Sequence, residues 1–204
     1  DCLLSRGLGD VYKRQMLYRI HEPPEFSRIQ KVRDFVKLLG LPFPEQPTQK
    51  DYQAVIDATK DRIDAPSIHA VLLRSMMQAY YGANNAGHFG LAYEAYTHFT
   101  SPIRRYPDLL LHRAIKAKLK HKPAPLSGAA LDDAGQHFSA TERRADEASR
   151  SVTTWLKCHY MQQHLGEEFV GTISAVAEFG LFVTLKDLYV CLLYTSPSPR
   201  DKRQ

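Results

Sequence analysis

The sequence has no apolar run that approaches the roughly 18 residues that a membrane span needs. It also shows no basic start, apolar stretch and small-residue cleavage site of a secretory signal. The three cysteines are widely spread, with neither a CxxC pair nor a Cys/His metal spacing: Cys2, Cys158 and Cys191. These absences predict a protein of a reducing cytoplasm with no membrane partner, and they give no support to a disulfide or zinc framework.

Composition and charge are those of an ordinary globular protein. Of 204 residues, 44% are hydrophobic and 24% are charged, enough for one substantial core or two small ones. The net charge is +5, but residues 1–15 contribute +1 and residues 191–204 contribute +2. The middle of the chain is therefore nearly balanced, and the global charge is weak evidence for a nucleic-acid partner.

The two ends differ from the rest of the chain. Residues 1–15 and 191–204 show no sustained amphipathic period and are rich in Leu, Ser, Arg and Tyr. They resemble translated sequencing-adapter sequence, so we expect non-native tails, with natural disordered tails as the alternative. Between them we expect a helix-rich domain over residues 16–165 and the start of a second domain over residues 166–190.

Hydrophobic periodicity predicts a mainly helical domain followed by strands. Expected helices cover residues 25–39, 51–59, 65–81, 101–120 and 131–164. The Gly- and Asn-rich residues 82–90 should be irregular. After Gly166 the period changes to two, which predicts a β-hairpin from residues 169–176 and 179–185.

The stretch HFGLAYEAYTHFTSPIRRYPDLLLH, residues 88–112, carries the most information. Thr100 or Ser101 can cap a helix that has Pro102 in its first turn, and such a helix start offers free amides to an anion. Arg104 and Arg105 stand in that first turn and could grip a phosphodiester oxygen. The alternative is structural, because Arg104 and Asp108 have the i, i+4 spacing of an exposed ion pair.

The same stretch closely resembles the signature of the ribonuclease II/R (RNB) family of 3'-to-5' exoribonucleases, in particular its ribonuclease R branch. The resemblance implies that Arg104 binds a phosphate near the scissile bond and is needed for cleavage. From the chemistry of the same helix start, we also expect Thr100, Ser101 and Arg105 to contact single-stranded RNA. The three histidines of this stretch have no metal-ligand spacing and are expected to be structural or to face substrate: His88, His98 and His112.

Glu142 is a second candidate. It sits at the edge of the apolar stripe of its expected helix, and a carboxylate there needs a partner or a function. Ser139 and Glu142 also have the spacing of a capping box, which is the structural alternative. The residues around it resemble the family's AERRADE stretch, with Thr141 replacing its first alanine. The resemblance implies that Glu142 contacts the 3'-terminal nucleotide.

The expected hairpin offers a third candidate. Phe182 lies opposite the apolar face, flanked by Gly180 and Thr184, so its ring could stack on a base. Equally, it could be an edge aromatic covered by strands that the chain lacks. The EFGLFV pattern resembles the first hairpin of the family's RNA-binding OB domain. Because an OB fold needs five strands, we expect a truncated barrel of low stability.

The resemblance implies an α+β fold class: the helix-rich C-terminal half of an RNB-type catalytic domain, then the truncated β-hairpin of an OB-fold barrel. The family cuts RNA with Mg²⁺ held by aspartates upstream of this part, and the aspartates present here form no D-x-D cluster. We therefore expect no metal site in this chain.

The whole protein is expected to be a monomeric, processive exoribonuclease that needs Mg²⁺ and no small organic cofactor. The chain itself should be inactive. Two alternatives are a non-catalytic RNA-binding fragment or degenerate family member, and a helical interaction domain without an RNA role.

Overall fold

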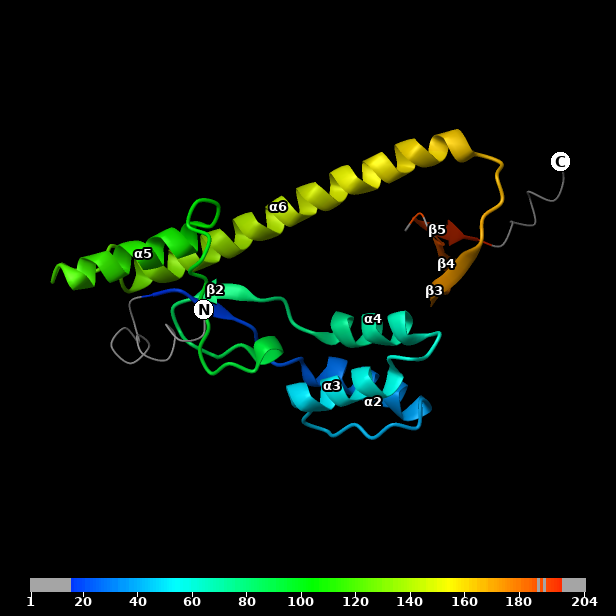
Figure 1. The fold of residues 1–204 in the computed structure, drawn as a ribbon, viewed down its shortest axis with the longest axis horizontal. Helices are drawn as coiled ribbons and strands as arrows, with labels where there is room; N and C mark the ends of the chain where they lie inside the picture. The colour runs from blue at the N-terminus through cyan, green and yellow to red at the C-terminus, as the bar shows by residue number, and fades with distance from the viewer. Residues whose placement is uncertain (1–15, 187, 189, 196–204) are drawn as a thin grey trace. The chain divides into compact units, whose positions relative to one another are not determined.

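The computed structural model describes residues 16–186, 188 and 190–195. The described residues divide into two compact units, one that ends at Arg144 and one that begins at Ala145. Helix α6 (Ala129–Met161) continues across the boundary between them (Figure 1). The fold is a helix-rich α+β arrangement with small antiparallel sheets, as the sequence predicts.

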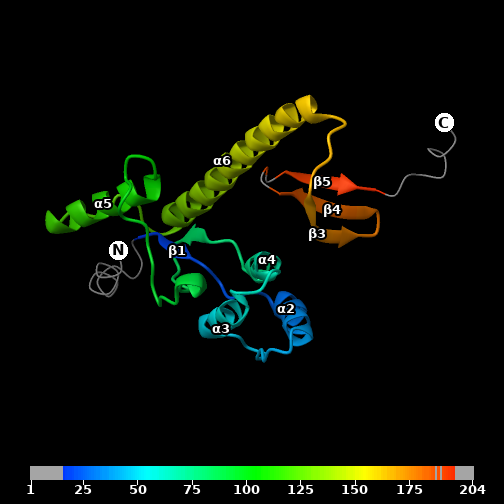
Figure 2. The same ribbon diagram turned by 45° about the vertical axis from the view of Figure 1, so that its right-hand side comes forward.

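Three helices of the first unit share one apolar core: α2 (Phe26–Leu38), α3 (Gln49–Thr59) and α4 (Ala65–Ser75) (Figure 2). Helix α3 begins at a capping box between Thr48 and Asp51, which satisfies two amides of its first turn. The buried members of the core are Val32, Val36, Phe43, Tyr52, Val55, Ile68 and Leu72. The expected helices over residues 25–39 and 51–59 are confirmed, within two residues at each end.

A two-stranded sheet replaces the end of the expected helix over residues 65–81. Helix α4 stops at Ser75 because Met76 takes an extended conformation. Strand β2 (Tyr80–Gly82) then pairs antiparallel with β1 (Tyr18–Ile20). The expected irregular segment beyond it contains only the short 3₁₀ helix η1 (Phe89–Leu91).

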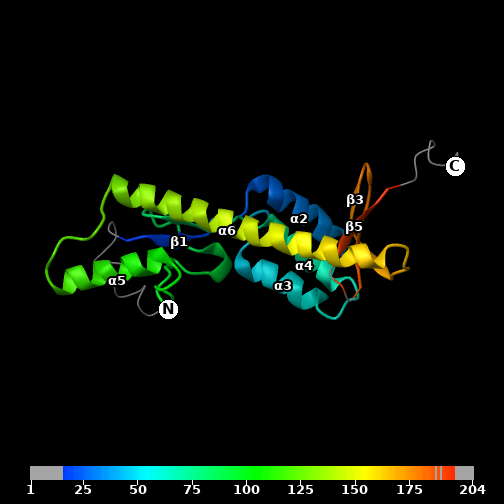
Figure 3. The same cartoon turned by 90° about the horizontal axis from the view of Figure 1, so that it is seen from above.

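Helix α5 (Tyr106–Leu119) and the first part of α6 pack against this sheet (Figure 3). Their shared core joins Leu110 of α5 and Leu131 of α6 to Leu17 and Tyr81. Gly135 allows the close approach of α6, because a Cβ there would lie 2.8 Å from the Tyr81 carbonyl oxygen.

The second unit holds the remainder of α6, the 3₁₀ helix η2 (Gln162–His164) and a three-stranded antiparallel sheet. Strands β3 (Gly171–Ala177) and β4 (Gly180–Leu185) form the predicted hairpin, with a register shift between Ile173 and Ala175. Strand β5 (Cys191–Tyr194) pairs with β4, although the sequence analysis assigns it to a tail. The remaining tail residues, 1–15 and 196–204, lie outside the described part of the chain.

The apolar stripe of the second half of α6 is open to solvent. Val152, Trp155 and Leu156 are each more than half exposed. Trp155 contacts His159 ring to ring at a centroid distance of 5.4 Å, on the same helix face. Periodicity indicates which face of a helix is apolar, but it does not indicate what covers that face. Within the described residues, no helix is both long and apolar enough to cross a membrane.

Candidate functional site

The turn before α5 is built on a buried carboxylate. The Ser101 amide donates to Oδ2 of Asp108 at 2.7 Å, and the amides of Arg104 and Arg105 both donate to the Ser101 carbonyl. Asp108 has no exposed surface. Residues 101–105 therefore form one closed turn anchored to the first turn of α5.

This geometry corrects the expected start of the helix. Helix α5 begins at Tyr106 with Arg105 as its N-cap residue, and Pro107 occupies its first turn. Proline is tolerated there because its missing N–H would have no intrahelical partner. Thr100 and Ser101 are not the cap, and the Ser101 amide is not free for an anion because Asp108 accepts it.

The two arginines of the turn have different environments. Arg105 Nη2 donates to Asp108 Oδ2 at 2.9 Å, with 22% of the Arg105 side chain exposed. Arg105 Nε and Asp108 Oδ1 are buried without a partner among the described residues. The expected alternative, an exposed pair between Arg104 and Asp108, is wrong, because Asp108 is buried and Arg105 is its partner.

Arg104 is exposed and makes no side-chain hydrogen bond or ion pair with any residue that the structure describes. Its backbone is nevertheless fixed by the turn. A guanidinium with five unused donors on a fixed backbone is well suited to a phosphate oxygen. The arrangement therefore separates an anchoring arginine, Arg105, from an available one, Arg104.

Glu142 has a partner that lies 123 residues away in sequence. Its Oε2 accepts from Arg19 Nη1 at 2.6 Å, with 15% of the Arg19 side chain and 33% of the Glu142 side chain exposed. The Arg19 guanidinium also lies over the Tyr81 ring at 4.7 Å from its centroid. Glu142 is thus held at a fixed place beside β1 and β2, with part of its carboxylate open to solvent.

The capping-box alternative for Glu142 is wrong. Ser139 lies ten residues inside α6, where its hydroxyl donates to the Gly135 carbonyl at 2.7 Å. The same hydroxyl accepts from the Tyr81 amide at 2.9 Å. Ser139 therefore joins α6 to β2 and does not start a helix.

Neutral rings fill the space between these charged groups. Tyr81 and His98 share a hydrogen bond between the hydroxyl and Nδ1 at 2.9 Å. Burial, and then the positive charges of Arg105 and Arg19, lower the pKa of His98 to about 4. Burial, with the nearby Glu142 carboxylate, raises the pKa of Tyr81 to about 12. Both groups are uncharged at neutral pH.

We call Arg19, Tyr81, His98, Arg105 and Glu142 the His98 cluster. Its residues come from β1, from β2, from the loop that precedes α5, and from helix α6, all within the first unit. Sequence patterns indicate Glu142 and Arg105 as candidates, but they do not indicate Arg19 or Tyr81. Their strands are three residues long, too short to give a period-two signal.

His112, also considered in the sequence analysis, has a structural role. Its ring stacks on Phe99 at a centroid distance of 4.3 Å, and its Nε2 lies 2.9 Å from the Phe99 carbonyl oxygen. It fixes the segment that leads into the turn of residues 101–105.

Phe182 belongs to the second unit and is described there by itself. It lies on the central strand, β4, opposite Ala175 of β3 and Leu193 of β5. Its ring is half-buried and meets Phe179 edge to face at 6.1 Å. Phe182 is therefore partly covered, between the two alternatives of an open stacking platform and a covered aromatic, whereas Phe179 is 64% exposed.

The described residues do not fit a magnesium site. No group of three or more His, Cys, Asp or Glu side chains within residues 16–186, 188 and 190–195 is placed to hold a metal ion. Mg²⁺ requires near-octahedral oxygen ligands, commonly with carboxylates among them. Glu142 and Asp108 are each occupied by an arginine instead.

Comparison with known proteins gives matches over most of the chain. The RNB domain family matches residues 4–121. Ribonuclease R of Vibrio cholerae is 46% identical over 202 residues, which cover 92% of this chain and 25% of that protein. Ribonuclease R of Escherichia coli is 44% identical over 208 residues, covering 93% and 26% respectively. The chain thus spans about a quarter of the length of these relatives. The family match begins inside the expected N-terminal tail, whose non-native origin stays a prediction.

Solved structures share the fold. Mycoplasma genitalium RNase R in complex with ribose-methylated single-stranded RNA matches with a TM-score of 0.84 and 26% identity, over 95% of this chain and 32% of that one. The yeast pseudonuclease Ssd1 matches with a TM-score of 0.75 and 22% identity, over 93% of this chain and 25% of that one. At that identity the second likeness shows a common fold alone.

Proposed function

The chain belongs to the RNB domain family, and from this premise we propose that it is part of a processive, hydrolytic 3'-to-5' exoribonuclease. The whole protein would degrade single-stranded RNA to nucleoside 5'-monophosphates. Relatives named ribonuclease R and a related structure with bound single-stranded RNA support this proposal. The observation that carries it is an exposed Arg104 on a turn that buried Asp108 holds in place.

In this proposal Arg104 binds a phosphate of the RNA. Its planar guanidinium can donate two parallel hydrogen bonds to one phosphate group. Thr100 and Ser101 flank it with hydroxyls that can reach neighbouring phosphate oxygens. Arg105 adds positive charge close by, although its Nη2 donates to Asp108.

Glu142 is proposed to contact the 3'-terminal nucleotide. A carboxylate accepts hydrogen bonds from ribose hydroxyls, which only RNA carries at the 2' position. The ion pair with Arg19 fixes its orientation and leaves one of its oxygens for such a contact. Phe182 is a separate proposed RNA contact in the second unit, where its ring would stack on a base.

The metal chemistry is assigned to the rest of the whole protein. We propose that Mg²⁺ is held there by carboxylates outside this chain, because the described residues offer no such set. The isolated chain is then inactive. The whole protein is further proposed to be a monomer of the cytoplasm that needs no small organic cofactor.

A second candidate function is RNA binding without cleavage in the whole protein as well. One observation favours keeping it: among the described residues, no group of three or more His, Cys, Asp or Glu side chains is placed to hold a metal ion. The open reading frame that encodes the whole protein distinguishes the two. An aspartate cluster upstream of this part supports the enzyme, and its replacement supports the binding protein.

The experiment measures binding and cleavage together. The purified chain is mixed with 5'-labelled single-stranded RNA, with and without Mg²⁺, and followed by fluorescence anisotropy and gel electrophoresis. We expect binding and no shortening of the RNA. Mg²⁺-dependent shortening would contradict the assignment of the metal site to the rest of the protein. A folded chain that does not bind RNA would contradict the RNA role of Arg104.

A further inference from the structure

The positive charge of the chain is concentrated in one short segment. Residues 109–131 contain no Asp or Glu and five basic residues: Arg113, Lys116, Lys118, Lys120 and Lys122. This segment therefore carries +5, and because residues 16–190 carry a net charge of +2, the rest of that range carries −3. The segment covers most of α5 and the loop that leads to α6. Such a concentration of one sign favours a polyanionic partner.

Three of these side chains lie on one face of α5. Arg113, Lys116 and the C-cap residue Lys120 are spaced i, i+3 and i+7, which places them on the same side of the helix. All three are exposed, whereas Leu110 and Leu111 of the same helix are buried. Among the described residues, none of the three forms an ion pair with a carboxylate. We call these three residues the basic face of α5.

The guanidinium of Arg113 is oriented by an uncharged partner. Its Nη1 donates to the Tyr106 hydroxyl at 2.9 Å, and its central carbon lies 5.6 Å from the centroid of the Tyr106 ring. Several other arginines of the first unit are paired with carboxylates instead: Arg19, Arg28, Arg33, Arg62 and Arg105. Tyr106 therefore fixes the direction of Arg113 without cancelling its charge.

The C-terminal end of α5 is ordered by backbone hydrogen bonds. The Lys122 amide donates to the Ala117 carbonyl at 2.8 Å, and the His121 amide donates to the Lys118 carbonyl at 2.9 Å. These two bonds form a Schellman motif, with His121 in the left-handed conformation at φ +49°. The backbone of Lys120 and Lys122 is therefore fixed before a ligand binds, which reduces the entropy that binding loses.

The helix dipole accounts for only part of this charge. Lysines in the last turn of a helix interact favourably with its partial negative charge, an effect that is confined to about one turn. Helix α5 has Lys116 and Lys118 in its last turn, and α2 has Lys37 there. Arg113 lies outside the last turn of α5, and Lys122 follows the helix. The dipole therefore explains neither Arg113 nor Lys122.

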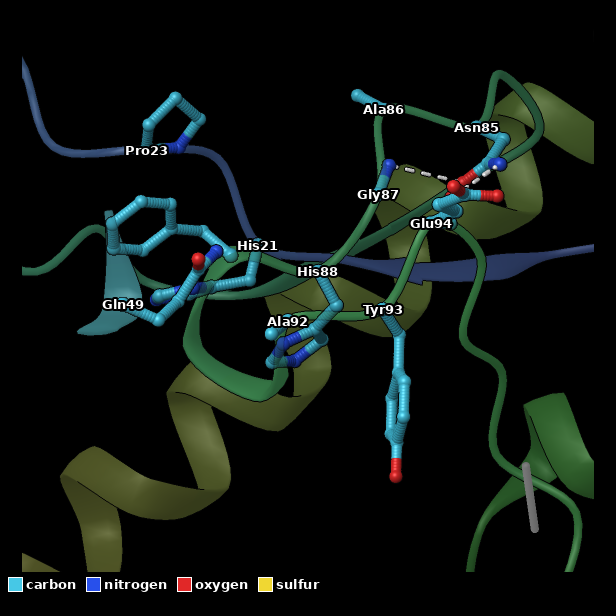
Figure 4. Close-up of a pocket in the computed structure, with 11 residues that line it drawn as sticks. His21, Pro23, Gln49, Asn85, Ala86, Gly87, His88, Ala92, Tyr93 and Glu94 are labelled. Carbon is cyan, nitrogen blue, oxygen red and sulfur yellow. Dashed lines mark hydrogen bonds between the residues drawn. The ribbon is translucent and has the colours of Figure 1, made fainter. Parts of the chain in front are cut away.

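The hollow around His88 offers no comparable site for an anion (Figure 4). No lysine or arginine is among the described residues that line it, and the acidic residue Glu94 does line it. A carboxylate repels a phosphate. Of these two features of the first unit, the basic face of α5 is the one that suits a chain of phosphates.

Packing contacts place the basic face relative to Glu142. At the start of α5, the Tyr106 ring meets the Phe138 ring of α6 at a centroid distance of 5.2 Å. One turn further along α5, Leu110 shares a core with Leu131 of α6. The two helices are therefore antiparallel here, and α5 runs away from Glu142 towards its basic end.

The proposed RNA contacts then follow one another in space. Glu142 comes first and Arg104 next, because Arg104 lies two residues before the start of α5. The basic face follows, further along the helix. From Tyr106 to Lys120 the helix rises about 21 Å. A stacked strand with one phosphate about every 3.4 Å needs about six nucleotides to cover this length.

We propose that the basic face of α5 binds the phosphates of single-stranded RNA on the 5' side of the phosphate that Arg104 contacts. Because Glu142 contacts the 3'-terminal nucleotide in the proposed function, the strand that leaves Arg104 towards its 5' end runs along α5. The basic side chains replace counterions of the strand, which gives affinity without base selectivity. The inference rests on the proposed RNA roles of Arg104 and Glu142 and extends the RNA path along α5.

The test titrates the full chain, over a range of salt concentrations, with a single-stranded RNA of about 12 nucleotides, which spans α5, and with one of about three, which does not. Lys116→Gln combined with Lys120→Gln removes two charges and keeps good helix-forming residues. We expect this double variant to bind the longer RNA about ten-fold more weakly at about 50 mM salt. The slope of log affinity against log salt should fall by about 1.4, because each contact contributes about 0.7. Binding of the shorter RNA should stay unchanged.

Lys31→Gln combined with Lys37→Gln is the matched control. Both lysines are exposed on α2, and Lys37 occupies the last turn of that helix. The control should change neither the affinity nor the salt slope of either RNA, and circular dichroism checks that each variant keeps its helices. No loss with the longer RNA in the α5 variant would overturn the site. An equal loss in the control, or an equal loss with the shorter RNA, would do so as well, because net charge would then act without a local contact.

Failure of this site differs from failure of the proposed function. Arg104→Ala is measured with the same two RNAs. If Arg104→Ala weakens the binding of both RNAs and the α5 double variant weakens neither, the α5 site alone fails. If the native chain binds neither RNA, the proposed RNA role of the chain fails, and the α5 site fails with it.

Discussion

The fully buried carboxylate of Asp108 binds Arg105 Nη2 at 2.9 Å, and the same oxygen accepts the Ser101 amide at 2.7 Å. One carboxylate oxygen thus closes the turn from which Arg104 projects. The pair is costly to break from the Asp108 side, because Arg105, whose Nε is buried, loses its carboxylate partner and the Ser101 amide loses its acceptor.

Asp108→Ala is therefore expected to lower the free energy of unfolding by about 3 kcal/mol. Asp108→Asn should cost less, since an amide oxygen can still accept the Ser101 amide. Urea denaturation followed by circular dichroism measures both. Asp133→Asn, an exposed carboxylate of α6, is the control and should stay within about 0.5 kcal/mol of the native chain. An Asp108→Ala variant as stable as that control would show that the buried pair does not hold the turn.

Arg19 and Glu142 are expected to be energetically coupled. Each single alanine variant removes the 2.6 Å ion pair, so the second substitution should cost less than the first. A double-mutant cycle measured by urea denaturation should give a coupling of about 1 kcal/mol, because the pair is only partly buried. If the effects of the two substitutions on the free energy of unfolding are additive, Arg19 and Glu142 do not interact.

Gly135→Ala is expected to destabilise the first unit by about 1–3 kcal/mol, the usual cost of overpacking. The added Cβ would lie 2.8 Å from the Tyr81 carbonyl oxygen and would push α6 away from β2. In a free helix the same change would stabilise, because alanine is the better helix former. Thermal unfolding shows whether Gly135→Ala lowers or raises the stability of the chain. Ser149→Ala, at an exposed position of α6, is the control. A stabilised Gly135→Ala variant would contradict the close packing.

Acid is expected to destabilise the chain partly through His98 and His88. The pKa of both falls from an ordinary 6.5 to about 4 in the folded state. The unfolded chain then binds more protons between these values, so their contribution is present above about pH 6.5 and is lost as the pH falls towards 4. Unfolding free energies measured across this window should fall less steeply in His98→Gln than in the native chain. His137→Gln, at an exposed ring, should leave the slope unchanged.

Local signals in the sequence were enough for much of the fold. Helical periodicity placed α2, α3 and the body of α6, and the switch to period two placed the β3–β4 hairpin. The position of Glu142 at the edge of an apolar stripe correctly indicated that it needs a partner. Its identity, Arg19, could not be read from sequence, because the pair spans 123 residues.

The differences between the predicted and the observed helices arise from tertiary contacts, which local sequence patterns do not show. A Ser-Pro pair commonly begins a helix. Here the buried Asp108 carboxylate accepts a hydrogen bond from the Ser101 amide, which closes a separate turn, and α5 begins only at Tyr106. The helix expected to reach residue 81 ends at Ser75, and the following strand β2 pairs with β1. The exposed stripe at Trp155 follows from periodicity, which indicates which face is apolar but not what covers it.

Salt-dependent binding of a short single-stranded RNA, compared between the native chain and Arg104→Ala, tests the central claim most directly. Arg74→Ala is the matched control, because Arg74 is exposed and makes no ion pair with a described residue. If Arg104 binds a phosphate, its loss weakens binding and lowers the slope of log affinity against log salt by about one, while Arg74→Ala changes neither. An Arg104→Ala variant that keeps the native affinity and slope would contradict the account.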